Sequence, residues 1–154
     1  MSDAITELER QESDLVFPSF DHDDAWRLGS RIAQIAREAG HPVGIDIRRP
    51  GLILFRAALP GSTPDQESWI ARKAAVVLRK ESSSALVKMQ LDAKGVSPAD
   101  AGLDPVEYAV TGGSFPIRVE GVGVVAAATA SGLSSLDDHA LIVEGIRAHL
   151  AEHA

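Results

Sequence analysis

The chain has 154 residues, of which 45% are hydrophobic and 24% charged, and these proportions are ordinary for a globular protein with its own core. The absence of cysteine excludes a disulfide framework, cysteine-based metal sites and a thiol nucleophile. A formal net charge of −7 disfavours nucleic acid and anionic membranes as partners. Because the sequence shows neither an apolar leader nor a long apolar run, we expect a cytoplasmic protein.

The first 14 residues are acidic and contain few apolar side chains, so we expect a flexible acidic tail or a short exposed helix there. Residues 15–154 are expected to form one domain. Its first helix is predicted over residues 23–39, because apolar side chains recur at steps of three and four from Ala25 to Ala39. Asp21 can cap this helix, and Gly40 and Pro42 can end it.

A pair of strands is predicted next. Residues 43–48 alternate between apolar and other side chains, and Arg49-Pro50-Gly51 is typical of a turn. Residues 52–59 then form an apolar run of strand length. Both of its faces are apolar apart from Arg56, so we expect this strand to be covered on both sides.

Helices follow over about residues 65–80 and 85–94. The first begins at a capping-box pattern, Thr-Pro-Asp-Gln at 63–66, and the second ends at Gly95. Two further capped starts, at Ser97 and Asp104, leave room for only a turn or two each.

Gly112-Gly113 opens a second hairpin, with strands at 114–119 and 122–130 around the turn Glu120-Gly121. The second strand is rich in alanine and glycine, so a helix, a second subunit or a flat ligand can pack very close to it. Ser134 or Ser135 caps a last helix that runs to about residue 149.

The order of elements is helix, hairpin, helices, hairpin, helix. Hairpins require antiparallel pairing, so a parallel βαβ arrangement is excluded. The sequence therefore predicts an α/β domain of the α+β type, with one mostly antiparallel sheet of four or five strands flanked by helices.

His139 is the first candidate for a functional residue. It shares a helical stripe with Val143 and Ile146, so its ring should point inward. It also lies near a helix start, where the positive dipole favours the neutral ring. A neutral imidazole can ligate a metal or haem iron, or act as a base. The structural alternative is a buried histidine bonded to a backbone carbonyl.

Trp69, Arg72 and Lys73 are the second candidate site. An aromatic ring beside two cations suits an anionic planar ligand or an acidic patch on a partner. The alternative places Trp69 in the core and both cations in solvent.

For two further groups of residues, the sequence allows either a ligand-binding role or a purely structural one. Gly112 and Gly113 precede Phe115 and can offer bare backbone amides to a carboxylate, or simply form a tight turn. Arg118 is either a pocket cation or a cation on the outer face of an edge strand.

Three segments resemble a known family. They are residues 58–73 (ALPGSTPDQESWIARK), 107–119 (EYAVTGGSFPIRV) and 121–146 (GVGVVAAATASGLSSLDDHALIVEGI). They are similar to small bacterial and fungal proteins of the HbpS/GlcG-like superfamily of haem-binding or haem-degrading domains, over about residues 15–149. The positions of this chain that match the motifs of that superfamily are Pro60-Gly61, Asp65, Trp69, Arg72-Lys73, 112–116, Ser131-Gly132 and Asp138-His139.

The resemblance implies a profilin-like three-layer fold, a homo-oligomer of at least two chains, and haem as the candidate cofactor. Many members carry a histidine where this chain has Arg56, so the chain departs from the family pattern there and lacks that candidate iron ligand; an arginine can instead form a salt bridge to a haem propionate. One fungal member is linked to the handling of tail-anchored proteins, which implies an adaptor role instead.

Two functions therefore remain open. The first is a homo-oligomeric cytoplasmic domain that binds haem or a similar planar anionic ligand and is linked to haem degradation. The second is a cofactor-free interaction or adaptor module. An enzyme that uses Asp138 and His139 as an acid/base pair is disfavoured, because adjacent helical residues point about 100° apart. The sequence assigns no reaction.

Overall fold

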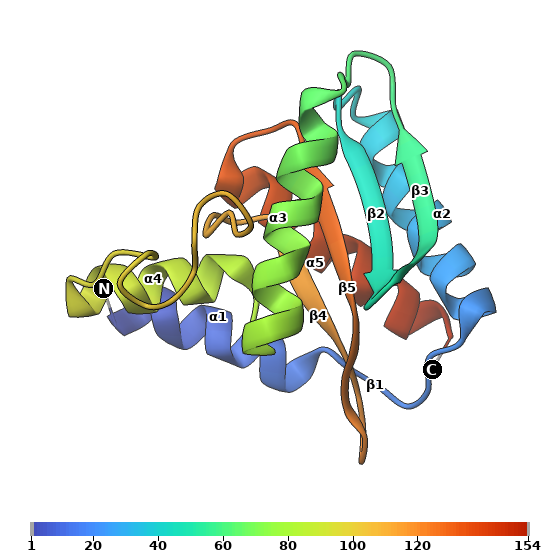
Figure 1. Ribbon diagram of the computed structural model, residues 1–154. Coiled ribbons are helices and arrows are strands. Elements are labelled where there is room, and N and C mark those ends of the chain that lie inside the picture. Colours follow the sequence, from blue (N-terminus) through green and yellow to red (C-terminus); the bar gives the residue numbers. More distant parts are fainter. Residues whose placement is uncertain (1, 154) are drawn as a thin grey trace.

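The computed structural model describes residues 2–153, so Met1 and Ala154, at the ends of the predicted tail and domain, lie outside it. The elements in chain order are α1 (Ser2–Asp14), β1 (Val16–Phe17), α2 (His22–Glu38), β2 (Gly44–Arg49), β3 (Leu52–Ala58), α3 (Asp65–Lys80), α4 (Ser84–Lys94), β4 (Ser114–Val119), β5 (Gly123–Ser131) and α5 (Ser135–Glu152). Helix α3 crosses in front of the sheet in Figure 1, and α2 and α5 lie behind it. Three layers result, as the resemblance implied.

The sheet has five strands in the order β1-β4-β5-β2-β3. The two predicted hairpins, β2–β3 and β4–β5, join through the antiparallel pairing of β2 with β5. The short strand β1 adds to β4, and this is the one parallel pair among the described strands. The predicted α+β class and mostly antiparallel sheet are confirmed, whereas β1 was not predicted because two residues carry no periodic signal.

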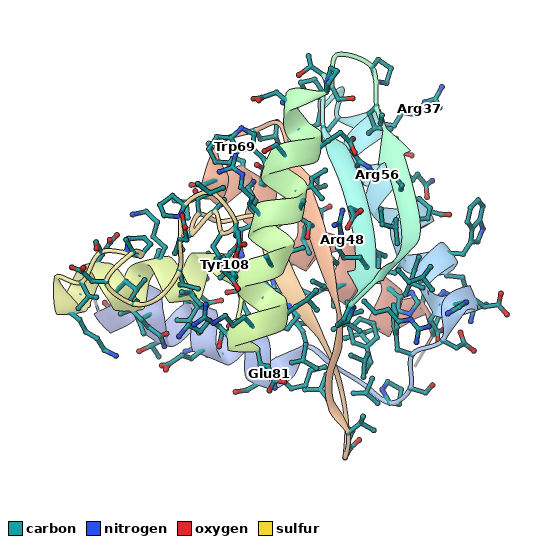
Figure 2. All side chains as sticks on the ribbon, viewed as in Figure 1. Arg37, Arg48, Arg56, Trp69, Glu81 and Tyr108 are labelled. Atoms are coloured by element: carbon teal, nitrogen blue, oxygen red, sulfur yellow. The ribbon has the colours of Figure 1, made fainter. Side chains whose placement is uncertain are left out.

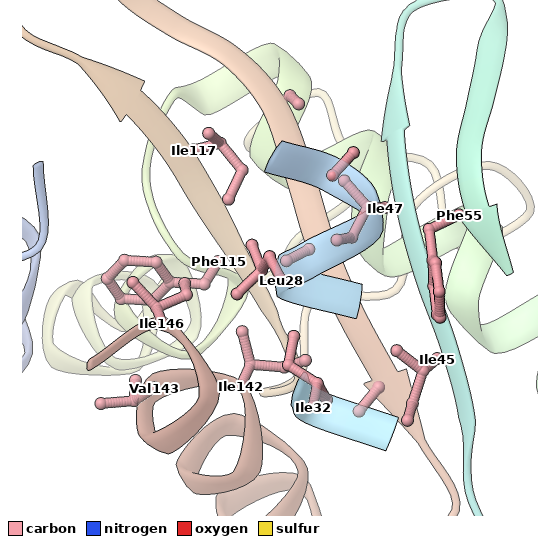
Figure 3. Close-up of a cluster of buried hydrophobic side chains, with 14 of the residues drawn as sticks. Leu28, Ile32, Ile45, Ile47, Phe55, Phe115, Ile117, Ile142, Val143 and Ile146 are labelled. Carbon is pink, nitrogen blue, oxygen red and sulfur yellow. The ribbon is translucent and has the colours of Figure 1, made fainter. Parts of the chain in front are cut away.

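The main core lies between the sheet and the helices α2 and α5. Figure 3 shows its large side chains, among them Leu28, Ile32, Ile45, Ile47, Phe115, Ile117, Ile142 and Ile146. The two helices approach closely at Gly145, where an added Cβ would lie 2.3 Å from Cγ1 of Ile32. The alanine-rich strand β5 is covered by helices on both faces, since Ala128 belongs to this core and Ala127 packs against α3. The sequence had left open whether a helix, a second subunit or a flat ligand packs against this strand. The structure shows that helices do.

The opposite face of the sheet carries buried polar side chains beside Ala127 beneath α3. Asp46, Thr129 and Ser114 lie side by side across β2, β5 and β4, and all three are fully buried. The hydroxyls of Ser114 and Thr129 are 2.8 Å apart, and Asp46 accepts two hydrogen bonds from Arg48 at 2.7 and 3.0 Å. These side chains therefore satisfy one another without a ligand.

One expectation for β3 is wrong. The sequence predicted a strand covered on both faces, but Phe55 is the one buried residue of β3, and Leu52 and Ile53 are 42% and 51% exposed. Among the described strands, β3 is also the last of the sheet and pairs with β2 alone. The apolar run was correctly predicted as a strand, but apolar character alone does not reveal its position in the sheet.

Residues 2–14, expected as a flexible acidic tail or a short exposed helix, form the helix α1 with a buried inner face. Leu8 packs against Ala85 and Leu86 of α4. A carboxylate oxygen of Glu12 accepts a hydrogen bond of 3.1 Å from the backbone N–H of Ser83, immediately before α4. Residues 2–14 are therefore a helix that packs on α4 rather than a free tail. Its partners in these contacts lie about 70 residues further along the sequence.

The two capped starts at Ser97 and Asp104 form turns rather than helices. The Ser97 hydroxyl accepts a hydrogen bond from the N–H of Asp100 at 3.1 Å, which satisfies the turn locally. Within residues 2–153, no helix combines the length and the hydropathy that a membrane span requires.

Candidate functional site

A cavity of about 350 Å³ lies between helix α3 and the start of helix α5. Its walls come from α3, from the segment before β4, from the end of β5 and from the first turns of α5. The lining residues are Gln66, Trp69, Lys73, Thr111, Ser131, Gly132, Leu133, Ser135 and Asp138. A larger hollow of about 680 Å³ lies between α2 and α5, but the cavity beside α3 contains a buried charged pair. We therefore take it as the candidate site.

The charged pair joins Lys73 of α3 to Asp138 of α5. The Lys73 ammonium donates to Oδ2 of Asp138 at 3.0 Å and to the carbonyl of Ala130 at 3.1 Å. The two side chains are only 4% and 2% exposed. Oδ1 of Asp138 accepts the N–H of Leu133 at 3.0 Å, so both carboxylate oxygens are bonded.

Burial shifts the pKa values of both groups. It lowers the pKa of Lys73, against the opposing effect of the Asp138 charge, and it raises the pKa of Asp138, against the effect of Lys73. Both directions favour movement of a proton from the amine to the carboxylate. Such a pair in a cavity differs from an ordinary surface ion pair and marks a candidate functional site.

Local sequence positions each member of the pair. Lys73 lies on the buried stripe of α3, three residues after Ile70 and four before Val77. Asp138 lies in the first turns of α5, whose N-cap is Ser134, one of the two predicted capping residues. Gly113 leaves the space for the amine, because its φ is +137° and an added Cβ would lie 2.6 Å from Nζ of Lys73.

Trp69 forms one wall of the cavity and is half-buried. Its indole N–H donates to Asp65 at 3.1 Å, and the guanidinium of Arg72 lies 4.4 Å from the ring centroid. The Arg72 guanidinium also donates to the Ser68 hydroxyl at 3.1 Å. The aromatic ring and the two predicted cations thus lie together, but Arg72 stacks on the ring while Lys73 is buried below it.

Two other predicted cations lie outside this cavity. Figure 2 shows Trp69 and Arg56 on opposite sides of helix α3. Arg56 pairs with Glu67 and donates to the backbone carbonyl of Ile45 at 3.0 Å. Arg118 donates to the carbonyl of Glu81 at 2.7 Å.

His139 points inward as predicted and is 4% exposed, but it does not line the cavity. Its Nε2 lies 2.7 Å from Oε1 of Gln11 in α1, and its ring centroid is 5.9 Å from that of the buried Phe115. Burial lowers the pKa of His139 to about 4, so the ring is neutral. Its partner is a side-chain amide rather than the expected backbone carbonyl.

Gly112 has a packing role in this structure. An added Cβ would lie 2.5 Å from the carbonyl oxygen of Ser135, so the glycine lets the start of β4 contact the start of α5. Across residues 2–153, no group of three acidic or histidine side chains is arranged to hold a metal ion. Among these residues His139 belongs to no such group, and its metal role stays a prediction.

Sequence reasoning did not select Asp138 as a partner of Lys73. An acid in the first turn of a helix is ordinary, because it interacts favourably with the helix dipole. The available signal was Lys73 itself, which falls on the apolar stripe of α3 and would need a buried acid. Which acid it meets depends on the packing of α3 against the end of β5.

The cavity fits an anionic group better than it fits haem iron. Its lining offers ammonium, amide, hydroxyl and indole groups and the Asp138 carboxylate that already pairs with Lys73, but no histidine, methionine or tyrosine that could ligate iron. The site accordingly suits a carboxylate, and no iron chemistry is assigned to it.

Comparisons with known proteins place these features in context. The family model described as "Haem degrading protein HbpS-like" matches residues 20–147. A UPF0303 protein of Streptomyces coelicolor is 52% identical over 149 residues, which cover 96% of this chain and 94% of that protein. A UPF0303 protein of Acidobacterium capsulatum is 47% identical over 147 residues, 95% of this chain and 89% of its own.

Solved structures share the fold. The Ybr137w protein superimposes with a TM-score of 0.88 at 32% identity, over 96% of this chain and 88% of its own. The structure of the PduOC–haem complex gives a TM-score of 0.72 at 16% identity, over 84% of this chain and 94% of its own. HbpS gives 0.68 at 18% identity, over 88% and 90%.

Proposed function

The chain belongs to the HbpS-like family of haem degrading proteins, and from this premise we propose its function. On this premise the protein is a cytoplasmic, homo-oligomeric ligand-binding protein. Its cavity beside Trp69 takes the anionic group of a planar ligand, and haem is the first ligand to test. The haem bound to PduOC, a protein of the same fold, supports that choice.

The observation that carries the proposal is that Trp69 and Lys73 line one cavity, with the Arg72 guanidinium stacked on the Trp69 ring. A carboxylate in the cavity meets the Lys73 ammonium and the first turn of α5, where the helix dipole favours negative charge. The flat part of the ligand then lies against Trp69, whose ring already holds the Arg72 guanidinium. Asp138 offsets part of the Lys73 charge, so the affinity depends on both the cation and the aromatic wall.

The volume of the cavity is too small to enclose a whole porphyrin. Its volume of about 350 Å³ is at the lower end of the roughly 300–1,000 Å³ of small-molecule sites. The proposal therefore places a propionate group of haem inside and the macrocycle outside, against Trp69. A link to haem degradation rests on the family description, and the residues of the cavity supply no step of that reaction.

Haemin titration tests this function. Trp26 is replaced by phenylalanine, so that Trp69 is the remaining tryptophan and its fluorescence reports on the cavity. We expect saturable quenching of Trp69, together with a shift of the haemin absorbance, and weaker binding in Arg72→Ala. Quenching that rises linearly with haemin, without saturation up to micromolar concentrations, contradicts the proposal.

The exposed edge of the sheet favours the adaptor function as a second candidate. Among the described strands, none lies on the outer side of β3, and its Leu52 and Ile53 are exposed, as is Trp26 of α2. Edge strands of this kind can pair with a strand of another chain. If this edge forms the homo-oligomer or recruits a partner, Ile53→Lys should lower the mass measured by size-exclusion light scattering or abolish capture of that partner. An unchanged mass and unchanged capture would exclude this edge as the interface.

A further inference from the structure

We infer that the Lys73 amine captures small aldehydes or 2-oxo acids as an imine, with Asp138 receiving and returning the proton. This deepens the proposed function, on which it rests, because it names a carbonyl-bearing ligand and a covalent step at the same cavity. Three observations support it: the position of the amine, the environment of the pair, and the groups that surround the space in front of it.

The amine is held in place at the wall of the cavity. Two acceptors, the carbonyl of Ala130 and Oδ2 of Asp138, lie 3.1 and 3.0 Å from Nζ. A lysine nitrogen has three hydrogen positions, so one position remains for a group in the cavity. The backbone at Gly113 limits movement on another side, because there is no room there even for a Cβ. The nitrogen is thus preorganised next to a ligand-sized space.

The pair is suited to produce a free amine, which is the form that attacks a carbonyl carbon. Burial lowers the pKa of Lys73 and raises the pKa of Asp138, so a larger fraction of the amine is unprotonated than in an amine in water. Lys80, Lys88 and Lys94, the other lysines of the chain, are exposed and lie outside this cavity. They therefore serve as internal references in the same molecule.

The step balances without an external oxidant or reductant. The ammonium first gives a proton to Oδ2 of Asp138, which leaves a lone pair on Nζ. That pair forms the C–N bond, the π electrons of the carbonyl move to its oxygen, and a proton passes from nitrogen to that oxygen. The Asp138 carboxyl then returns its proton to the hydroxyl group, the C–O bond breaks, and water leaves. The product is an iminium ion paired with the Asp138 carboxylate.

The lining of the cavity selects the class of carbonyl compound. The hydroxyls of Thr111 and Ser135 can donate to the carbonyl oxygen or to a neighbouring carboxylate. The first turn of α5 favours a negative charge beside the carbonyl carbon. Trp69 suits a flat, conjugated group. A small 2-oxo acid or carboxylated aldehyde satisfies all three.

Reductive trapping with glyoxylate tests the inference, because this compound carries an aldehyde next to a carboxylate. The full-length protein is incubated with glyoxylate and cyanoborohydride, digested, and analysed by mass spectrometry at each lysine. We expect Lys73 to be labelled faster than Lys88, because burial lowers the pKa of Lys73 and leaves a larger fraction of free amine. Oxalate, which has carboxylates but no aldehyde, should protect Lys73 and leave Lys88 unchanged. Labelling of Lys73 at or below the rate of Lys88 overturns the inference.

Two further measurements separate this inference from the proposed function. In Trp26→Phe, saturable quenching of Trp69 by oxalate reports anion binding without a covalent step. Quenching without labelling of Lys73 overturns covalent capture alone, and the absence of both overturns the ligand site as well. Asp138→Asn removes the acid that returns the proton to the hydroxyl group, so labelling of Lys73 should be slower than in the wild type in protein that keeps its circular dichroism spectrum, although loss of the carboxylate lowers the pKa of Lys73 further. The wild-type comparison between lysines remains decisive if that variant does not fold.

Discussion

The amine of Lys73 lies 3.0 Å from a carboxylate oxygen of Asp138, although 65 residues separate them in the sequence. Lys73 belongs to the helix that covers one face of the sheet, and Asp138 to a helix on the other face. The pair therefore joins the two outer layers at the end of β5. It also forms the wall of the cavity, so structure and ligand binding depend on the same contact.

Replacing one member of this pair should destabilise the protein strongly. Asp138→Leu leaves the Lys73 ammonium buried without a counter-charge, which typically costs about 3–5 kcal/mol. Urea unfolding followed by circular dichroism measures the loss. The double variant Lys73→Met with Asp138→Leu contains no buried charge and should recover much of the stability. Equal instability of the single and double variants would show that the charge is not the cause.

Stability should fall as the pH falls below neutral, because His139 is neutral in the folded protein. Burial lowers its pKa from the ordinary value of 6.5 to about 4, so between these values the unfolded chain binds more protons than the folded protein. The contribution is fully present above pH 6.5 and is lost toward pH 4, by up to about 3 kcal/mol.

The control for this pH dependence is His139→Gln, measured by urea unfolding over the same range. The raised pKa of Glu12 acts in the opposite direction, and the lowered pKa of His149 acts in the same direction. Both groups remain in the variant, so the difference between the two pH profiles isolates His139. Parallel profiles would contradict the neutral, buried ring.

Gly113→Ala should be destabilising and should also disturb the cavity. The new methyl group would lie 2.6 Å from both Nζ of Lys73 and the carbonyl oxygen of Ala130. We expect a loss of more than about 2 kcal/mol, because overpacking adds to the cost of a positive φ. Gly121→Ala is the matched control, since its φ is also positive but nothing lies within 4 Å. Its thermal unfolding should change less, and equal shifts of Tm would refute the steric explanation.

Gln11→Ala should reveal the docking of α1. The variant leaves the buried Nε2 of His139 without its partner, which should cost about 1–3 kcal/mol. Arg10→Ala, one residue earlier, removes only an exposed pair with Glu7, worth about 0–1 kcal/mol. Hydrogen exchange of α1 should rise in Gln11→Ala and not in Arg10→Ala. If the exchange of α1 is the same in both, the contact with His139 does not hold the helix.

Trp69→Leu should weaken the binding of a planar anion while leaving the fold intact, because Trp69 is half-buried at the cavity wall. Loss of the aromatic face should reduce haemin affinity about threefold to tenfold, which corresponds to about 0.5–1.5 kcal/mol. Trp26→Phe, on the far helix α2, is the control and should bind as the wild type does. Absorbance titration measures both, and equal affinities would place the ligand elsewhere.

Local patterns in the sequence predicted most elements of the fold. They located three kinds of element within a few residues of the observed bounds: the helix before Gly40, the two apolar hairpins and the capped last helix. The three segments that resemble the HbpS-like family correctly predicted family and layers. The edge position of β3, the parallel strand β1 and the packing of α1 were not predicted, since each depends on partners far along the chain.

The candidate residues divide in the same way. Helical spacing, which is a local property, correctly placed Arg72 on the Trp69 ring and Lys73 near it, and their role in ligand binding stays a prediction. The helical stripe of His139 correctly predicted that its ring points inward, but neither this nor the strand positions of Arg56 and Arg118 revealed that all three lie outside the cavity. A local pattern indicates which way a side chain points, but not which partner it meets.

By itself, the sequence determined the elements, the α+β class and the family, because periodicity, capping and turn residues act over a few neighbouring positions. Only the tertiary structure decided that Lys73 is buried and that Asp138 is its partner. That choice follows from the strand order and from the space at Gly113, which bring the end of β5 and the start of α5 against α3. The charge that a side chain carries is fixed by its chemistry, whereas the partner that compensates it is fixed by packing.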